Sequence, residues 1–358
     1  MPLTGPYASD SEEMLQALEM AIDEYNAEGG LLGRKLTLVT CDVGALEVDT
    51  IQACAERLLG ENPDAVITGY DDSGVNTLAF GEGDMPYLHA VTMRAAIEPV
   101  MDDPEKYGNV FQYDPSDYDY GTNAAAVLPD VAERLGFEPA NRTVAVITTD
   151  YAYNAVGADA FIETIKQQGY DLALKEVIPF GVQEFLKLVQ VPRLRGAAEG
   201  GHPLRRAGVR PNPEQDRGGG AGVRHVLGPG SVRRRAVHAA VDAAVRGHGD
   251  PEPFSIHPFV VRDAFDIWAQ AVQEVGCVEC YDKVVEAIRA TDYLGFAGRY
   301  RFTPPEEGQY AMPGDDLLPT IWSQVQDAQN VVVLPDVAAE GTLQMPPWVP
   351  QVPQVPQD

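Results

Sequence analysis

The sequence has no long apolar run and few basic residues or cysteines. No window of about 18 residues is both apolar and uncharged, so no segment is expected to cross a membrane as a helix. Lys and Arg number 26 against 54 Asp and Glu, a net charge of −28. Such an acidic chain is not expected to bind nucleic acid through its phosphates. Four cysteines are too few for a disulfide scaffold.

Signals of catalysis and of secretion are also missing. The sequence contains no G-x-S-x-G elbow and no glycine-rich phosphate loop, and we expect no enzymatic activity, no cofactor and no metal. The four histidines between 202 and 248 are spaced too irregularly for a zinc site. Met1 is followed at once by Pro2 and a turn, without the basic and apolar leader of a signal peptide.

A regular alternation of helices and strands is present. The 358 residues, 45% of them hydrophobic, predict two lobes of about 150–180 residues and a sizeable core. Helices alternate with strands, which predicts parallel sheets with helices on both faces. After a first helix that ends at Gly29-Gly30, helices are expected at 48–59, 75–80, 120–135, 156–168, 260–275 and 281–290. Strands are expected at 36–41, 65–68, 86–91, 143–148, 172–178, 295–302 and 320–335.

The first helix has the clearest signals. Ser9 followed by Glu12 predicts a capping box at its start, and Gly29-Gly30 predicts its end. Its apolar residues recur at helical spacing and predict one buried face. These residues are Met14, Leu15, Leu18, Ala21, Ile22 and Tyr25.

The run PLTGPYAS, followed by a long helix that ends in NAEGGLLGRKL, resembles the start of type I periplasmic solute-binding proteins. These are the extracytoplasmic receptors of ABC importers for branched-chain amino acids, amides and urea. GFAGRYRF, TIWSQVQDAQNVVVLP and LQMPPW resemble later segments of the same family. The resemblance implies the α/β, two-lobe type I fold, in which each lobe is a mostly parallel sheet with helices on both faces.

The resemblance also bears on the start of the chain and on location. In the family, PLTG directly follows a first buried strand. We expect that this strand and a signal peptide are missing from the sequence, and that the protein acts in the periplasm or outside the cell.

Loops at the carboxyl ends of strands are where open α/β sheets bind ligands. Ser73 follows strand 65–68, and the family places a serine in this turn to bind the ligand carboxylate. The resemblance puts Ala90, through its backbone, and Thr92, through its hydroxyl and N–H, at the same carboxylate. The structural alternatives are a helix N-cap for Ser73 and an ordinary strand end for the other two.

The resemblance implies a tyrosine ligand contact from the second lobe. Tyr153 matches that tyrosine, although Asn154 stands where the family has glycine, and Tyr151 is the fallback. A ring there would cover the ammonium group or the side chain of the ligand; core packing is the alternative for both tyrosines. Ser9 and Asp10 are expected at the rim.

Both lobes are expected to be discontinuous in sequence. Residues 1–115 and 254–300 are assigned to the first lobe, and 116–186 and 301–345 to the second. The tail at 346–358 is proline-rich and is expected to be extended or disordered.

Residues 187–249 differ from the rest of the chain in composition. They hold 11 of the 20 arginines and 12 glycines, contain no aromatic residue and carry a net charge of +8. One hypothesis is translation in the wrong reading frame of GC-rich DNA, between two compensating indels, in place of part of the second lobe. The others are a basic insert that binds an anionic partner and a flexible linker.

The cysteines form two close pairs in sequence. Cys277-x-x-Cys280 has neither a thioredoxin-like context nor a second pair, so a local disulfide or two idle thiols is expected. Cys41 and Cys54 flank a loop and would pair in an oxidising compartment if the geometry allows it.

Together these features predict a monomeric extracytoplasmic receptor. It would capture a small amino acid of the branched-chain type, or a short amide such as urea, between its lobes and deliver it to an ABC permease in the membrane. Two alternatives stay open: a cytoplasmic ligand-sensing regulator on the same fold, and the non-functional product of a damaged gene.

Overall fold

The computed structural model describes residues 1–70, 74–136, 141–180, 257–326 and 329–345. These residues form two compact units, which we describe separately. Unit 1 contains the described residues of 1–120 and 257–320, and unit 2 contains those of 121–180 and 321–345. The segment 187–249 and the tail at 346–358 lie outside the described residues.

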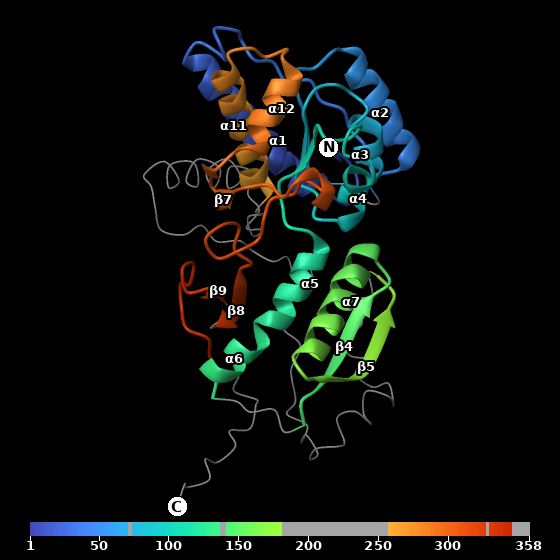
Figure 1. Ribbon diagram of the computed structural model, residues 1–358, viewed down its shortest axis with the longest axis vertical. Helices are drawn as coiled ribbons and strands as arrows, with labels where there is room; N and C mark the ends of the chain where they lie inside the picture. Colours follow the sequence, from blue (N-terminus) through green and yellow to red (C-terminus); the bar gives the residue numbers. More distant parts are fainter. Residues whose placement is uncertain (71–73, 137–140, 181–256, 327–328, 346–358) are drawn as a thin grey trace, which may run out of the picture. The chain divides into compact units, whose positions relative to one another are not determined.

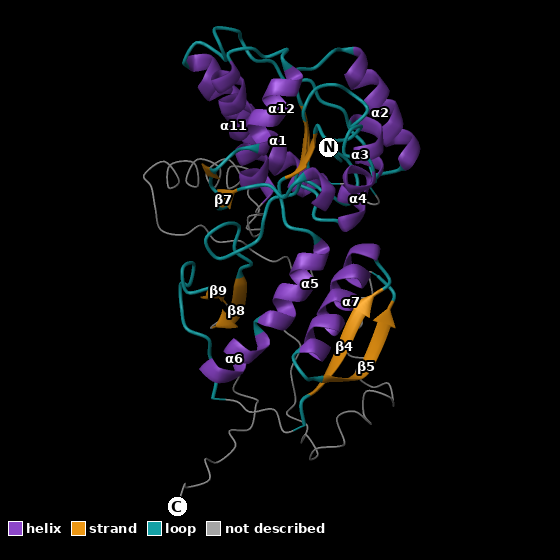
Figure 2. Ribbon diagram, viewed as in Figure 1, coloured by secondary structure: helices purple, strands orange, loops and turns teal. Residues whose placement is uncertain are grey.

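Unit 1 is built on a parallel sheet of three strands in the order β1-β2-β3. Figure 2 draws the strands in orange and the helices around them in purple. The strands are β1 (Val66–Thr68), β2 (Tyr87–His89) and β3 (Val110–Gln112). Their register places the last residues, Thr68, His89 and Gln112, in one row. The loops that follow the three strands therefore begin at one edge of the sheet, as the alternation of helices and strands predicted.

Helices cover both faces of this sheet (Figure 1). One face packs on α1 (Ala8–Ala27), α11 (His257–Val275) and α12 (Tyr281–Arg289). The other packs on α2 (Val48–Gly60), α3 (Val75–Phe80) and α4 (Arg94–Asp102). Since side chains alternate along a strand, Leu88 contributes to the first core and its neighbour Tyr87 to the second.

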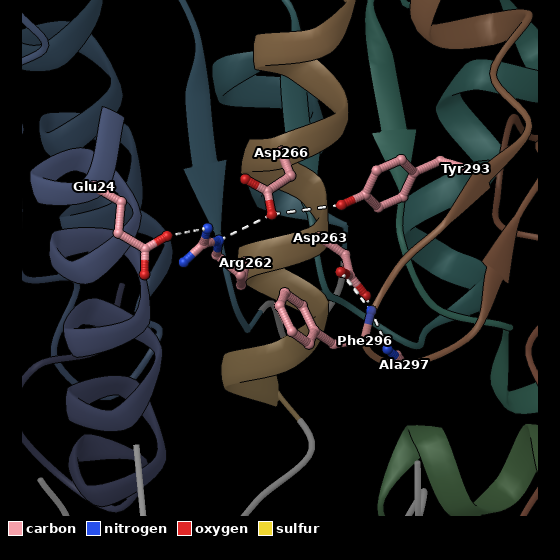
Figure 3. A network of polar contacts seen from close by, with 7 residues as sticks. All are labelled: Glu24, Arg262, Asp263, Asp266, Tyr293, Phe296 and Ala297. Carbon is pink, nitrogen blue, oxygen red and sulfur yellow. Dashed lines mark hydrogen bonds and ion pairs between the residues drawn. The ribbon is translucent and has the colours of Figure 1, made fainter. Parts of the chain in front are cut away.

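A buried polar network joins α1, α11 and the turn after β6 (Figure 3). The Arg262 side chain is buried and donates to Glu24 of α1 at 2.6 Å and to Asp266 at 2.9 Å. The next residue, Asp263, accepts hydrogen bonds from the N–H groups of Phe296 and Ala297 at 2.8 and 2.9 Å. Most of α11 is buried, so these contacts pair charged groups inside the unit.

The segment 36–41 does not form the predicted strand. Leu36 bonds to the side chain of Asn26, but no backbone hydrogen bond joins residues 37–39 to any other described residue. A strand needs a neighbouring chain to bond to, and here none lies alongside among the described residues.

The start of the first helix also differs from the prediction, whereas its end does not. α1 begins at Ala8, so Ser9 lies exposed inside the helix and the capping box is wrong. The backbone supplies the first contact instead, from Ser11 N–H to Tyr7 O at 3.1 Å. The end at Gly29-Gly30 is confirmed: both glycines have positive φ, and Gly30 N–H donates to Tyr25 O at 2.8 Å.

Two further elements are split where one was expected. Residues 295–302 contain a turn, not one strand, because Gly295 N–H bonds to Gly298 O at 2.8 Å. The turn joins the antiparallel strands β6 (Tyr293–Leu294) and β7 (Arg299–Tyr300). The helix expected at 120–135 is two helices, since Pro129 has no N–H to continue the first. These are α5 (Asp117–Ala126) and α6 (Leu128–Arg134).

Residues 301–320 pack with unit 1, although the prediction assigned 301–345 to the second lobe. Ala311 N–H donates to Gln112 O at 2.8 Å, so this segment pairs with the end of β3. The Gln309 side chain is fully buried and donates to the carbonyls of Gly108 and Val110. The short helix η1 (Pro305–Glu307) lies in this segment.

Unit 2 contains a parallel β-α-β motif, as predicted. β4 (Thr143–Thr149) and β5 (Asp171–Ile178) are joined by α7 (Ala152–Gln167). Near the end of the chain, β8 (Trp322–Gln326) and β9 (Gln329–Leu334) form an antiparallel pair, where the sequence predicted strands over 320–335.

All four cysteines are paired, as Cys41–Cys54 and Cys277–Cys280. The first disulfide attaches the end of segment 36–41 to α2. None of the helices that the structure describes has the length and apolar character needed to cross a bilayer.

Candidate functional site

The candidate site in unit 1 lies at the edge where β1, β2 and β3 end. Of the predicted residues, Ala90 and Thr92 follow β2 at this edge. Ser73 lies outside the described residues, so its role stays a prediction. The described residues on either side of 71–73 are held in place.

Side-chain contacts hold the described residues that precede and follow 71–73. Asn76 Nδ2 donates to Tyr70 O at 2.7 Å, and Thr77 Oγ1 donates to Ala96 O at 2.8 Å. Gly74 has φ +77°, and a Cβ there would lie 2.3 Å from Ala95 O. Only glycine fits this conformation and this approach to α4. The close approach of the Gly74 backbone to α4 therefore fixes the residue from which α3 begins.

Ala90 and Thr92 have different hydrogen-bonding capacity. Ala90 is buried, and its N–H donates to Thr68 O at 3.0 Å within the sheet. The backbone of Ala90 can therefore offer a ligand only its carbonyl oxygen, which accepts from an ammonium or amide N–H and does not bind a carboxylate. Thr92 is half-buried, and no described residue bonds to its hydroxyl or N–H. Among the described residues, none occupies these two donors of Thr92.

Asp117 holds the Thr92 loop against the start of α5. Asp117 N–H donates to Thr92 O at 2.7 Å, and its carboxylate accepts from Arg94 N–H at 2.9 Å and from Tyr118 N–H at 3.0 Å. Burial raises the pKa of Asp117 to about 6, against the opposing effect of these N–H groups. The contacts fix the backbone direction of Thr92, which is what a positioned donor requires.

An aromatic and acidic cluster lies at the end of β1. The Tyr70 hydroxyl donates to Asp10 Oδ2 at 2.6 Å and lies 3.3 Å from His257 Nδ1, and its ring lies 5.4 Å from that of Tyr7. Burial, followed by the bond to Asp10, raises the pKa of Tyr70 well above its ordinary value. Burial lowers the pKa of His257 to about 4, so the imidazole is neutral near pH 7. Asp10 thus contacts the turn after β1, whereas Ser9 does not take part.

The predicted tyrosines of unit 2 lie at the start of α7, at the carboxyl end of β4. Tyr151 is the N-cap of α7, and its ring stacks on Phe180 with 4.9 Å between centroids. Tyr153 lies in the first turn, with its ring 6.5 Å from that of Tyr151. Asn154, which replaces the expected glycine, donates to Thr149 Oγ1 at 2.6 Å and so ties α7 to β4.

The structure places further polar residues at this edge that the sequence interpretation did not select. Asp117 and Tyr70 each follow a strand of the sheet, so the rule that selected Thr92 also applies to them. No sequence pattern pointed to His257. It lies close to the Tyr70 hydroxyl only because of the way α11 packs in unit 1.

The arrangement can bind and orient a polar ligand. In unit 1, Thr92 supplies donors and the Ala90 carbonyl supplies an acceptor. His89, the histidine nearest to them in sequence, is fully buried in β2, and burial lowers its pKa to about 3. It is not placed to act as a catalytic base. In the described part of the chain, no three His, Cys, Asp or Glu side chains are arranged to hold a metal ion.

The chain resembles curated binding proteins over part of its length. It is 28% identical over 199 residues to Leu/Ile/Val-binding protein homolog 7 of Brucella melitensis, a match that covers 55% of this chain and 48% of the relative. Homolog 8 of Brucella abortus is 27% identical, and this match also covers 55% of the chain and 48% of the relative. The chain thus spans about half the length of the curated relatives it matches.

Solved structures match over nearly the whole chain. A protein from Silicibacter pomeroyi assigned to a branched-chain amino acid ABC transporter has a TM-score of 0.76 at 22% identity, covering 97% of this chain and 98% of its own. A leucine-binding protein from Thermotoga maritima has a TM-score of 0.62 at 16% identity, covering 93% and 96%. At these identities the likeness shows the fold, and it confirms the predicted type I periplasmic binding protein fold.

Residues 1–197 match the family model described as periplasmic binding protein. This match covers more than half of the chain and confirms the resemblance seen at its start. It also confirms the expectation of a binding protein and not an enzyme. The chain belongs to the periplasmic binding protein family.

Proposed function

We propose that this protein is the substrate receptor of an ABC importer and that its ligand is a branched-chain amino acid, with leucine the first to test. Two findings support the choice of ligand. The curated relatives are Leu/Ile/Val-binding protein homologues, and one structure of the same fold, from Desulfitobacterium hafniense at 19% identity and TM-score 0.63, is a complex with Leu.

The observation that carries the proposal is the state of Thr92. Its hydroxyl and N–H have no partner among the described residues, while Asp117 N–H holds its carbonyl at 2.7 Å. A carboxylate is the natural partner for two positioned donors, because hydrogen bonds to a charged group are about twice as strong as neutral ones. Serine at position 73, on the neighbouring turn, would add a third donor.

The Ala90 carbonyl supports an amino acid over a simple carboxylic acid. Its N–H is used by Thr68, so the free carbonyl would accept from the ligand ammonium. An amide or urea offers N–H groups to the same carbonyl but no carboxylate to Thr92. A ligand with both groups uses both residues, and we therefore favour an amino acid over a short amide.

The partner and the location follow from the same proposal. A receptor of this kind passes its ligand to a membrane permease and acts in the periplasm or at the outer face of the cell. The two disulfides are consistent with an oxidising compartment.

The test is calorimetric titration of the purified chain with leucine, isoleucine, valine, acetamide and urea. Leucine should bind, and Thr92→Ala should weaken binding about 10- to 100-fold, the loss of about 1.5–3 kcal/mol expected for a hydrogen bond to a charged group. Thr291→Ala, between α12 and β6 in the same unit, is the matched control and should leave the affinity unchanged. Equal leucine affinity in the two variants would show that Thr92 is not part of the site. Binding of urea, but of none of the amino acids, would contradict the proposal that the ligand is an amino acid.

The tyrosines of unit 2 are tested separately. If Tyr153 covers the ligand, Tyr153→Leu should weaken leucine binding about 5- to 30-fold, by loss of about 1–2 kcal/mol of cation–π attraction. Tyr170→Leu, a partly exposed tyrosine of the same unit with Arg142 over its ring at 4.7 Å, should have no effect. A loss seen only in Tyr151→Leu would move the contact to Tyr151.

A further inference from the structure

Asp114 carries a buried carboxyl group at the edge of the sheet where the candidate site of unit 1 lies. It comes two residues after β3, and the N–H of its neighbour Tyr113 donates to His89 O at 2.8 Å. Asp114 is 2% exposed. Its carboxyl group accepts no hydrogen bond from any described residue and forms no ion pair with one. Such a group is costly in its charged form, because nothing replaces the water it has lost.

Other acids at or near this edge differ from Asp114 because donors hold them. Asp117 and Asp263 each accept hydrogen bonds from two backbone N–H groups. Asp119 accepts from the N–H and the hydroxyl of Ser116, both at 2.9 Å. Donors of this kind favour the charged form of a carboxyl group. For Asp114 burial acts alone and raises its pKa well above the ordinary value of 3.8, so this group keeps its proton at a pH where an exposed aspartate has lost it.

Among the described residues, the side chains around Asp114 bring no positive charge. In its ionised form Asp114 acts on the hydroxyls of Tyr70 and Tyr300: after burial, which has the largest effect, it is among the acids that raise their pKa values. Tyr70 does not donate to it, since the Tyr70 hydroxyl donates to Asp10 at 2.6 Å. The other titratable groups around these two hydroxyls are Asp10, Glu13, Tyr113, His257 and Asp263. None of them is cationic near pH 7, because burial lowers the pKa of His257 to about 4.

An ammonium group supplies the two things that Asp114 lacks, a donor and a positive charge. Under the proposed function, the ligand ammonium donates to the Ala90 carbonyl. Ala90 and Tyr113 come directly after the paired residues His89 and Gln112 of β2 and β3, and adjacent strands lie about 4.8 Å apart. Asp114 therefore follows the strand end next to Ala90, at the same edge of the sheet.

We propose that Asp114 is the counter-charge in unit 1 for the ammonium group of the ligand, and that binding of this ligand releases the proton of Asp114 to the solvent. The ammonium group keeps its own protons, and the carboxyl O–H bond is the one that breaks. The inference rests on the proposed function, because it takes the ligand to be an amino acid. Since the bound state holds one proton fewer, the affinity for leucine rises with pH.

The first test is calorimetric titration of the full chain with leucine at pH 6 in two buffers of different ionisation enthalpy, which counts the protons released. About one proton should leave per leucine bound, and the Kd should fall by up to about ten-fold per pH unit between pH 5 and pH 7. The matched ligand is 4-methylpentanoate, which is leucine without its amino group. It should bind more weakly than leucine and release no proton.

The second test uses two variants. In Asp114→Asn the proton release should disappear, the Kd for leucine should stop depending on pH, and leucine should bind about 10- to 100-fold more weakly at pH 7. Asp263→Asn, which alters a buried acid with two N–H donors, is the matched control and should keep the proton release.

Leucine binding to the unmodified chain without proton release would overturn the inference and leave the proposed function standing, and this measurement needs no variant. Proton release that persists in Asp114→Asn would also overturn it. Absence of leucine binding to the unmodified chain would overturn the proposed function and this inference with it.

Discussion

At the scale of single residues, the candidate site in unit 1 depends on which backbone groups at the edge of the sheet the strand pairing leaves free. Ala90 and Thr92 are two positions apart, yet the N–H of Ala90 donates to Thr68 O, whereas the N–H of Thr92 bonds to none of the described residues. Sequence reasoning could place both at the end of a strand. It could not distinguish them, because the difference depends on the register between β1 and β2.

Gly74 gives a prediction at this scale. Gly74→Ala should lower the free energy of unfolding by about 2–4 kcal/mol, since a Cβ there combines a positive φ with a clash against Ala95 O. Gly33→Ala, at φ +78° with open space, should lower it by only about 1–2 kcal/mol, the left-handed penalty alone. Gly60→Ala, which meets neither constraint, should be neutral or slightly stabilising. Urea denaturation measures all three, and equal effects at positions 74 and 33 would contradict the clash.

At the scale of elements, α11 joins the parts of unit 1. It is almost entirely buried, packs on α1 and the sheet, and carries Arg262, Asp263 and Asp266 inside (Figure 3). The apolar periodicity predicted this helix to within three residues of its start. It did not indicate the buried charges, whose partners Glu24 and Phe296 lie far away in the sequence.

The Arg262 contacts predict a large effect of removing the charge. Arg262→Met should lower the free energy of unfolding by about 3–5 kcal/mol, because it leaves the Asp266 carboxylate buried without its main partner. Arg34→Met breaks an exposed ion pair with Glu279 and should lower it by less than about 1 kcal/mol. Thermal and urea unfolding of the two variants provide the comparison. Similar losses in both would show that burial of the Arg262 network contributes little.

Asp263 predicts a pH dependence with a definite sign. Burial raises its pKa from 3.8 to about 7, against the effect of the Phe296 and Ala297 N–H groups. Between pH 4 and 7 the folded protein keeps a proton that the unfolded chain has lost, so this residue makes stability fall as the pH rises. Asp263→Asn should make the unfolding free energy less dependent on pH in this window, whereas exposed Asp23→Asn should not. Parallel pH curves for Asp263→Asn and the unmodified protein would contradict this assignment.

At the scale of the whole molecule, residues 187–249 differ from the rest of the chain in charge and composition. The net charge is −28, yet residues 187–249 carry +8, so the remainder carries −36. The predicted change of reading frame in this segment has a direct test. Sequencing of the gene from its upstream region through codon 260 should show two compensating indels, near codons 186 and 250. A read that confirms every codon would leave a basic insert or a linker as the explanation.

The sequence by itself determined the order of helices and strands, the glycine turns and the family, because these depend on local periodicity and on short motifs. Only the tertiary structure decided that residues 37–39 have no backbone partner among the described residues and that 295–302 contains a turn. It also decided that Thr92, unlike Ala90, keeps its donors with respect to the described residues. Each of these depends on hydrogen bonds or burial between residues distant in the chain. The same residue types would form other hydrogen bonds if other residues lay beside them in the folded chain.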